Sequence, residues 1–257
     1  MKLKVLGSTS KGNCYILEND HEALIIEAGI SISRVRKALD QDLHKVAGCL
    51  ISHSHNDHAG HMMMYAKAGI RIFSSRAVFN TRRINKLRSK GMLLEPGQVC
   101  FIGGFQVVSF DVNHDIPCLG FLITHPDSGR IAFITDTFKF DNSFNDIDHF
   151  LIECNYANDI LDNNVVTGII HPGLRKRIRV SHMELENCKA ALMANDLVKA
   201  RQIILLHLSD NNSCRVRFRE EVAAVTGKEV FIATSGAEIC MLNDPSGKPE
   251  LRPARSL

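Results

Sequence analysis

The chain contains no tryptophan and only three tyrosines among its 257 residues. Aromatic side chains on which a planar ligand could stack are therefore scarce. The chain also lacks any apolar stretch close to the roughly 18 residues that a membrane-spanning helix needs. Its first seven residues follow a strand-like pattern and do not resemble a signal peptide. We therefore expect a cytoplasmic protein without a membrane partner.

Cys-x-x-Cys pairs are absent as well, although the chain has eight cysteines. Cys49, Cys118, Cys154 and Cys240 lie within apolar runs, which is typical of thiols packed in a core. A zinc ribbon or a disulfide framework is therefore disfavoured, and reduced thiols agree with the cytoplasm.

A strong net charge is missing too, because 31 Lys and Arg against 28 Asp and Glu leave only +3. The field of the whole molecule therefore does not indicate a polyanionic partner. Basic residues nevertheless gather locally, and each cluster is explained either by a solvated helix face or by a binding site. The three clusters are Arg82, Arg83, Lys86, Arg88 and Lys90; Arg175, Lys176, Arg177 and Arg179; and Arg215, Arg217 and Arg219.

Short apolar segments alternate with amphipathic ones along the chain, which predicts strands flanked by helices. The predicted strands are residues 3–6, 14–17, 23–27, 48–51, 71–73, 99–102, 106–111, 119–124, 131–134, 150–154, 203–206, 229–232 and 238–242. The predicted helices are residues 32–39, 59–67, 77–87, 183–195 and 214–226. This order predicts two layers of sheet covered by helices, in a single domain over residues 1–243 with a loosely ordered tail at 244–257.

Three imidazoles and a carboxylate follow the apolar run at residues 46–51, in the segment His53-Ser54-His55-Asn56-Asp57-His58. Burying several such groups together at the end of a strand is costly unless they hold cations. Three later strands also end in a metal-binding residue, namely His114, Asp136 and His207. We therefore predict a metal centre at one edge of the sheets.

The pattern His-x-His-x-Asp-His resembles the signature of the metallo-β-lactamase superfamily of binuclear metallohydrolases. The resemblance implies an αββα sandwich of two mixed sheets flanked by helices. It implies a first metal ion on His53, His55 and His114, a second on Asp57, His58 and His207, and Asp136 bridging both. The nucleophile would be a hydroxide between the ions. A set of His and Asp ligands accepts zinc, manganese or iron, so the sequence does not name the metals.

The turn at residues 7–14, Gly-Ser-Thr-Ser-Lys-Gly-Asn-Cys, resembles the opening of the YycJ/WalJ-type subgroup, described as DNA-directed exonucleases and related phosphodiesterases. Ser8, Ser10 and Asn13 could offer hydrogen-bond donors to a phosphate, although a simple β-turn between two strands explains the same residues. Residues 152–156, 174–182 and 207–212 also resemble this subgroup. The resemblance assigns Arg175, Lys176, Arg177 and Asn212 to substrate binding, Asp57 to catalysis as well as metal binding, and His182 to protonation of the leaving oxygen or to phosphate binding.

Two segments depart from the subgroup. Glu27 stands where an Asp is usual, so a carboxylate behind the metal ligands would reach them by a longer arm. The segment that begins at Ser181-His182 matches its motif only partly, which weakens the transfer of a polynucleotide substrate. We expect a metal-dependent hydrolase of phosphodiester bonds that acts on DNA or RNA like an exonuclease. A hydrolase of a cyclic phosphodiester, thioester or lactone and a non-catalytic metal-dependent binder of nucleic acid are the alternatives.

Overall fold

The computed structural model describes residues 1–81 and 91–241. The basic cluster from Arg82 to Lys90, the end of the helix predicted at 77–87 and the tail predicted at 244–257 lie outside these residues. The assignment of residues 1–243 to one domain stays a prediction.

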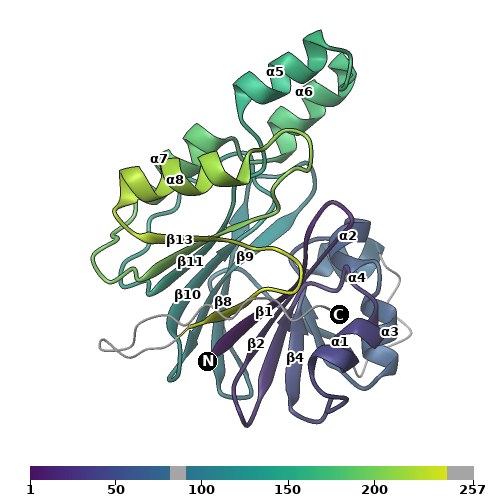
Figure 1. The fold of residues 1–257 in the computed structure, drawn as a ribbon. Helices are drawn as coiled ribbons and strands as arrows, with labels where there is room; N and C mark the ends of the chain where they lie inside the picture. The colour runs from purple at the N-terminus through teal and green to yellow at the C-terminus, as the bar shows by residue number, and fades with distance from the viewer. Residues whose placement is uncertain (82–90, 242–257) are drawn as a thin grey trace.

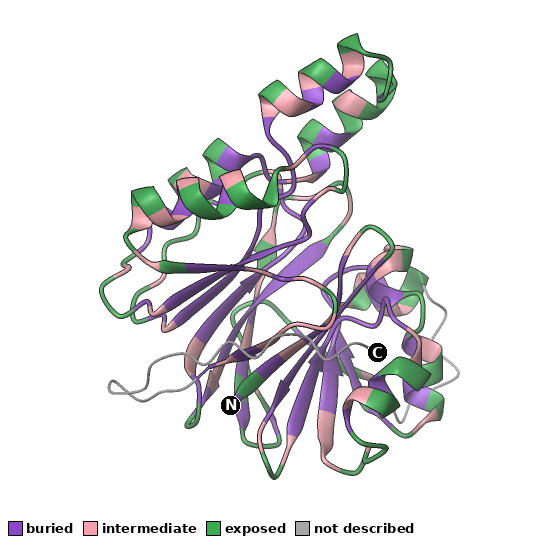
Figure 2. Ribbon diagram, in the orientation of Figure 1, coloured by how far each residue is buried: buried purple, intermediate pink, exposed green. Residues whose placement is uncertain are grey.

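Two seven-stranded sheets form the centre of the fold (Figure 1). Their strands are buried along most of their length, as Figure 2 shows, because apolar side chains fill both faces of each sheet. The first sheet has the order β14 (Glu238–Cys240), β1 (Lys2–Thr9), β2 (Gly12–Glu18), β3 (Ala23–Ile26), β4 (Val46–Leu50), β5 (Ile72–Ser74) and β6 (Gly91–Leu93). The second has the order β13 (Glu229–Ile232), β12 (Gln202–Leu206), β11 (His149–Glu153), β10 (Gly129–Ile134), β9 (Cys118–His125), β8 (Phe105–Val112) and β7 (Val99–Ile102).

Each sheet is half antiparallel and half parallel. In the first, β14, β1, β2 and β3 pair antiparallel, and β3 to β6 pair parallel. In the second, β10 to β13 pair parallel, and β7 to β10 pair antiparallel. The parallel halves matter for function, because parallel strands bring the loops that follow them to one edge of a sheet.

Helices cover the outer face of each sheet (Figure 1). On the first sheet they are α1 (Ile32–Ala38), α2 (Asn56–Ala59), α3 (Met62–Lys67) and α4 (Arg76–Thr81), and on the second they are α7 (Leu185–Met193) and α8 (Arg215–Thr226). One apolar core joins the two sheets through residues such as Leu3, Phe121 and Phe133, and separate cores fill the space beneath each helical layer. The predicted αββα sandwich is confirmed.

Two helices form a projection at one end of the sandwich (Figure 1). These are α5 (Asn158–Val166) and α6 (Pro172–Ser181), which enclose a small core of Tyr156, Leu161, Ile170 and Ile178. The predicted elements include neither of these helices nor the three-residue strand β6, and the helix predicted at 59–67 corresponds to α3 and the last residue of α2. The reason is physical, since short elements with few apolar residues carry too little periodic signal to stand out from loops.

The longest helix in the described part of the chain is α8, with 12 residues. Among the described residues, no helix has the length and apolar character that spanning a bilayer requires.

One ion-pair cluster ties the first sheet together at Glu18. The Glu18 side chain is 11% exposed and pairs with Lys4, at 2.5 Å, and with Lys45. Burial by itself would raise the pKa of Glu18, but hydrogen bonds from the two ammonium groups lower it below its ordinary value.

We predict that Glu18→Gln destabilises the fold by about 1 kcal/mol at pH 7, because the variant leaves two half-buried ammonium groups without their carboxylate. Since the folded pKa of Glu18 is depressed, its contribution is present above the unfolded pKa and is lost as the pH falls through the folded pKa. Urea unfolding at pH 7 and pH 3 measures this. The difference between wild type and variant should shrink at pH 3, and a difference that does not change with pH would contradict the assignment.

Candidate metal centre and adjoining pocket

Strand ends bring the predicted ligands to one edge of the sandwich. The segment with His53, His55, Asp57 and His58 follows β4, and His114 follows β8. Asp136 follows β10 and His207 follows β12. All seven predicted metal ligands therefore reach the same region, although they are spread over more than 150 positions of the chain.

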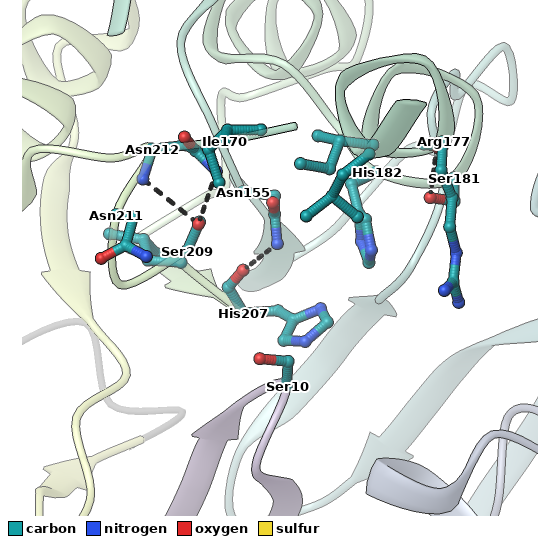
Figure 3. A pocket seen from close by; sticks show the side chains of 13 residues that line it. Ser10, Asn155, Ile170, Arg177, Ser181, His182, His207, Ser209, Asn211 and Asn212 are labelled. Carbon is teal, nitrogen blue, oxygen red and sulfur yellow. Dashed lines mark hydrogen bonds between the residues drawn. The ribbon is translucent and has the colours of Figure 1, made fainter. Parts of the chain in front are cut away.

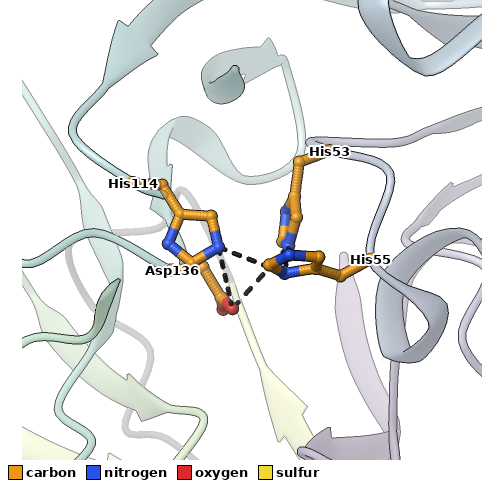
Figure 4. Close-up of side chains that lie close together, drawn as sticks. All are labelled: His53, His55, His114 and Asp136. Carbon is orange, nitrogen blue, oxygen red and sulfur yellow. Dashed lines mark hydrogen bonds and ion pairs between the residues drawn. The ribbon is translucent and has the colours of Figure 1, made fainter. Parts of the chain in front are cut away.

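The first group of side chains contains His53, His55, His114 and Asp136 (Figure 4). Its imidazole nitrogens nearly touch: His55 Nδ1 lies 3.1 Å from His53 Nε2 and 3.3 Å from His114 Nε2. Asp136 Oδ2 lies 3.8 Å from His53 Nε2 and 4.0 Å from His114 Nε2. Four donor atoms thus surround one point, as a single cation requires.

The second group contains Asp57, His58, His207 and again Asp136. Asp136 Oδ1 lies 3.3 Å from His58 Nε2 and 2.8 Å from His207 Nδ1. Asp57 Oδ2 lies 3.3 Å from His58 Nε2 and 3.6 Å from His207 Nε2. Asp136 therefore turns one carboxylate oxygen to each group, which is the arrangement that a bridging ligand needs.

A third group overlaps the second and contains Asp136, His207, Glu153 and His182. Glu153 Oε1 accepts a hydrogen bond from His182 Nδ1 at 2.8 Å and lies 3.2 Å from His207 Nδ1. Its other oxygen accepts from the backbone N–H groups of Thr137 and Met183. The carboxylate of Glu153, fully buried at the end of β11, thus fixes the position of both imidazoles.

Charges in this region are buried and depend on one another. Burial lowers the pKa of His53 well below its ordinary value, and neighbouring His58 lowers it further. Burial would also lower the pKa of His207, but Asp136 raises it to about 10. Burial would raise the pKa of Asp136, yet His207 and His58 hold it well below its ordinary value. A metal ion would replace the protons on these imidazoles as the source of positive charge, because metal binding displaces protons from the ligands.

A further observation indicates that these residues suit divalent cations. His207 Nε2 is buried without a hydrogen-bond partner, and it faces Asp57 Oδ2 at 3.6 Å. A buried polar atom left in this state is costly, and a metal ion between the two atoms would satisfy both.

Further contacts orient the imidazole rings of His114 and His58 through their Nδ1 atoms. His114 Nδ1 donates to the backbone oxygen of Ser181 at 2.7 Å, which leaves Nε2 for the centre of the cluster. Glu27 Oε1 lies 3.4 Å from His58 Nδ1, so this glutamate does reach the ligands where the subgroup usually has an aspartate. Glu27, Asp136 and His207 have positive φ angles of 69°, 39° and 53°, a strained conformation that is common at functional sites.

The predicted phosphate-binding turn is a tight hairpin between β1 and β2. Ser8 is buried, bonds to Tyr15 and accepts from the backbone N–H of His207 at 2.9 Å. Asn13 is buried, and its amide lies 2.9 Å from His58 Nε2 and 3.2 Å from Asp57 Oδ2. These contacts place Ser8 and Asn13 against the cluster, whereas Ser10 lines the adjoining pocket, and the predicted contacts of all three with a phosphate stay predictions.

A pocket of about 300 Å³ adjoins His182 and His207 (Figure 3). Ser10, Ser209 and Asn211 line one side of it, and α6 lines the other. Asn212 also lines the pocket, where its amide bonds to Asn164 of α5 and to Ser209. Its predicted role in substrate binding stays a prediction.

The basic run at residues 175–179 lies on α6. Arg175 pairs with Asp162 of α5 at 2.6 Å, and Arg179 hydrogen-bonds Asn158. Lys176 is exposed, and Arg177 lines the pocket. The cluster therefore divides into Arg175 and Arg179, which contact α5, the exposed Lys176, and Arg177, which lines the pocket.

Sequence reasoning gave no role to two acidic residues of this region. The sequence offered a signal for Glu153, because it is a carboxylate at the end of a buried strand. Asp136 has a similar position, two residues after the end of β10. Asp115 Oδ1 lies 3.0 Å from His114 Nε2 and 3.4 Å from His55 Nε2, on the side of the first group that is partly exposed. Its position next to His114 was visible in the sequence, but the approach to His55 depends on the fold.

Comparison with known proteins gives the same picture. The model of the beta-lactamase superfamily domain matches residues 24–208. The chain belongs to the beta-lactamase superfamily. Among solved structures, this superfamily member resembles the metallo-beta-lactamase fold protein YhfI from Bacillus subtilis, with a TM-score of 0.68 and 20% identity over 92% of this chain and 98% of that one. The predicted metallo-β-lactamase fold is thereby confirmed.

Two curated relatives of this superfamily member carry more specific names. Exodeoxyribonuclease YycJ of Bacillus anthracis is 25% identical over 252 residues, which are 93% of this chain and 94% of that protein. Exodeoxyribonuclease WalJ of Streptococcus pneumoniae serotype 2 is 27% identical over 229 residues, which are 83% of this chain and 84% of that protein. The predicted resemblance to the YycJ/WalJ-type subgroup is confirmed.

We predict that removing a shared ligand empties both sites, whereas removing an unshared ligand empties one. Asp136→Ala should lower the metal content of the dialysed protein from about two ions per chain to well below one, because it removes a ligand from both groups. His55→Ala should lower the content by about one ion. Elemental analysis measures both. Asp141→Ala, an exposed carboxylate, is the control, and wild-type metal content in Asp136→Ala would refute the bridging assignment.

Proposed function

We propose that the protein is a metal-dependent hydrolase of phosphodiester bonds that acts on DNA or RNA as an exonuclease-like enzyme. The observation that carries the proposal is the position of Asp136, whose two oxygens face two separate groups of ligands. Two divalent ions, zinc or manganese with iron as a further option, would supply an activated water and stabilise the charge that develops on phosphorus. The names of the two curated relatives support a polynucleotide substrate.

The chain's own residues provide orientation and proton transfer. Asp57 has a partly exposed carboxylate that contacts His58 and His207, so it can accept a hydrogen bond from the attacking water. His182 donates through Nδ1 to Glu153, which turns the opposite side of the ring toward the pocket. Its place beside Asp136, at 4.0 Å, suits either protonation of the leaving oxygen or a hydrogen bond to the phosphate.

Other parts of the proposal concern location and substrate contacts. The eight cysteines are free thiols, which suits the reducing cytoplasm where we propose that the protein acts. Arg177 and Ser10, which line the pocket beside His182, are the residues that we propose for contact with the phosphate backbone.

The central test is digestion of end-labelled single- and double-stranded DNA and RNA by protein loaded with zinc or manganese. We expect mononucleotides to be released from one end, and Asp136→Ala should release none. The same preparations should be assayed with a cyclic dinucleotide, a thioester and a lactone. Turnover of one of these without any polynucleotide cleavage would establish a small-molecule hydrolase. Tight binding of nucleic acid without any hydrolysis would establish a non-catalytic binder.

The role of His182 can be tested by changing the leaving group. His182→Ala should lower turnover of DNA by roughly two to four orders of magnitude while both metals stay bound. Glu153→Gln should also lower it, because an amide has one acceptor oxygen, whereas Glu153 accepts from His182 on one oxygen and from two backbone N–H groups on the other. If His182 donates a proton, a nitrophenyl phosphodiester should recover most of the lost rate, and if it binds phosphate the defect should persist.

Two controls accompany this experiment. His44→Ala, an exposed imidazole outside the cluster, should behave as wild type. Loss of a metal ion from His182→Ala would overturn both roles and make His182 a ligand.

A further inference from the structure

The pocket beside the metal centre has two unlike walls, and this difference indicates what it holds. We propose that it binds one nucleotide unit next to the bond that is cut, with the base against the apolar face of α6. The inference rests on the proposed function and extends it, because it assigns a binding site for a single base to residues outside the ligand cluster.

One face of α6 forms the first wall. Leu174, Arg177, Ile178 and Ser181 line the pocket at spacings of three, four and seven residues, which places them on one side of the helix. Ile170 extends the apolar part of this wall. Leu174 is 43% exposed, so a large aliphatic side chain is left uncovered at the pocket. A flat base that lies on this wall would remove apolar surface from water on both partners.

Polar groups form the second wall. Ser10 comes from the hairpin between β1 and β2, and Ser209 and Asn211 come from the loop after β12 (Figure 3). Hydroxyl and amide groups can both donate and accept, so they suit the mixed edges of a base and the hydroxyls of a sugar. A purely apolar ligand would displace water from this wall without replacing its hydrogen bonds, although Ser209 Oγ also accepts from Asn212.

The inner end of the pocket connects it to the chemistry. His182 and His207 line it, and His207 also belongs to the second ligand group. The three histidines of the first group, His53, His55 and His114, are not among its lining residues. A phosphodiester held at the cluster would therefore extend into the pocket on the His182 side only. The pocket volume of about 300 Å³ is at the low end for small-molecule sites, which suits one nucleotide unit.

Contacts of the projecting helices fix the pocket before a ligand arrives. Asn164 of α5 donates to Asn212 Oδ1 at 2.9 Å, which ties the helical projection to the opposite loop. Arg217 of α8 pairs with Asp159 of α5 at 2.6 Å and anchors the projection to the sandwich. The two walls are thus held at a set separation, and a preformed site costs less ordering entropy on binding.

The test compares a nucleotide with its base-free counterpart. Metal-loaded protein should bind deoxyadenosine monophosphate, with its phosphate on either the 5′ or the 3′ oxygen, at least about tenfold more tightly than deoxyribose phosphate. Leu174→Ser should weaken nucleotide binding by about tenfold and leave binding of deoxyribose phosphate within about twofold, since it removes apolar surface from the base wall alone. Titration calorimetry measures both ligands.

Val180→Ser is the matched control, because Val180 lies on α6, is 51% exposed and does not line the pocket. It should bind both ligands as wild type does. Equal binding of nucleotide and deoxyribose phosphate by wild type, or equal effects of the two substitutions, would overturn the base site. Metal content and melting temperature exclude misfolding as the cause. Cleavage of bis(nitrophenyl) phosphate by the same wild-type preparation tests the proposed hydrolase separately, so that failure of the hydrolase and failure of the base site give different results.

Discussion

The carboxylate of Asp136 is the constraint on which the site depends. It is almost fully buried, and each of its oxygens faces a different set of imidazoles. A buried anion is stable only where opposite charge surrounds it, and the imidazoles supply that charge only when they carry protons or metal ions. The strand ends must therefore be held together against the mutual repulsion of their own side chains, which requires a rigid scaffold beneath them.

The scaffold meets this requirement with paired sheets and a layer of buried polar contacts. Glu27 contacts His58, and Glu153 accepts a hydrogen bond from His182. The backbone oxygen of Ser181 accepts a hydrogen bond from His114. Ser8 and Asn13 of the first hairpin reach the same cluster from the other sheet. Ligand geometry is thereby set by residues from both halves of the sandwich, so a disturbance of the contact between the sheets should reach the metal centre.

The helices α5 and α6 contrast with this scaffold. They bury a small core of their own and are tied to the sandwich largely by polar contacts, such as Arg217 to Asp159 and Asn164 to Asn212. Such an element can change in sequence without weakening the sheets, since few of its side chains enter the main cores. In the proposed function the ligand cluster would carry out the chemical step, and this projection, whose helix α6 lines the pocket, would distinguish substrates.

The sequence by itself determined most of the strands and the residues that gather in the cluster. Apolar runs such as residues 203–206 identify buried strands through local pattern alone, and the crowding from His53 to His58 is visible because it spans six positions. His114, Asp136 and His207 were found since each follows such a strand. The metal roles of these residues stay predictions, but the structure brings them together as expected.

Tertiary structure alone decided how the remaining groups are used. Glu153 meets His182 across 29 positions, and Arg177 faces the pocket while Arg175 pairs with Asp162. Nothing in the local pattern distinguishes Arg177 from Arg175, because both are cations on one short helix. The packing of α6 against α5 and the opposite loop separates them. Spacing along the chain can therefore identify candidate ligands that follow strands, whereas contacts between distant segments become visible only when the two sheets are packed.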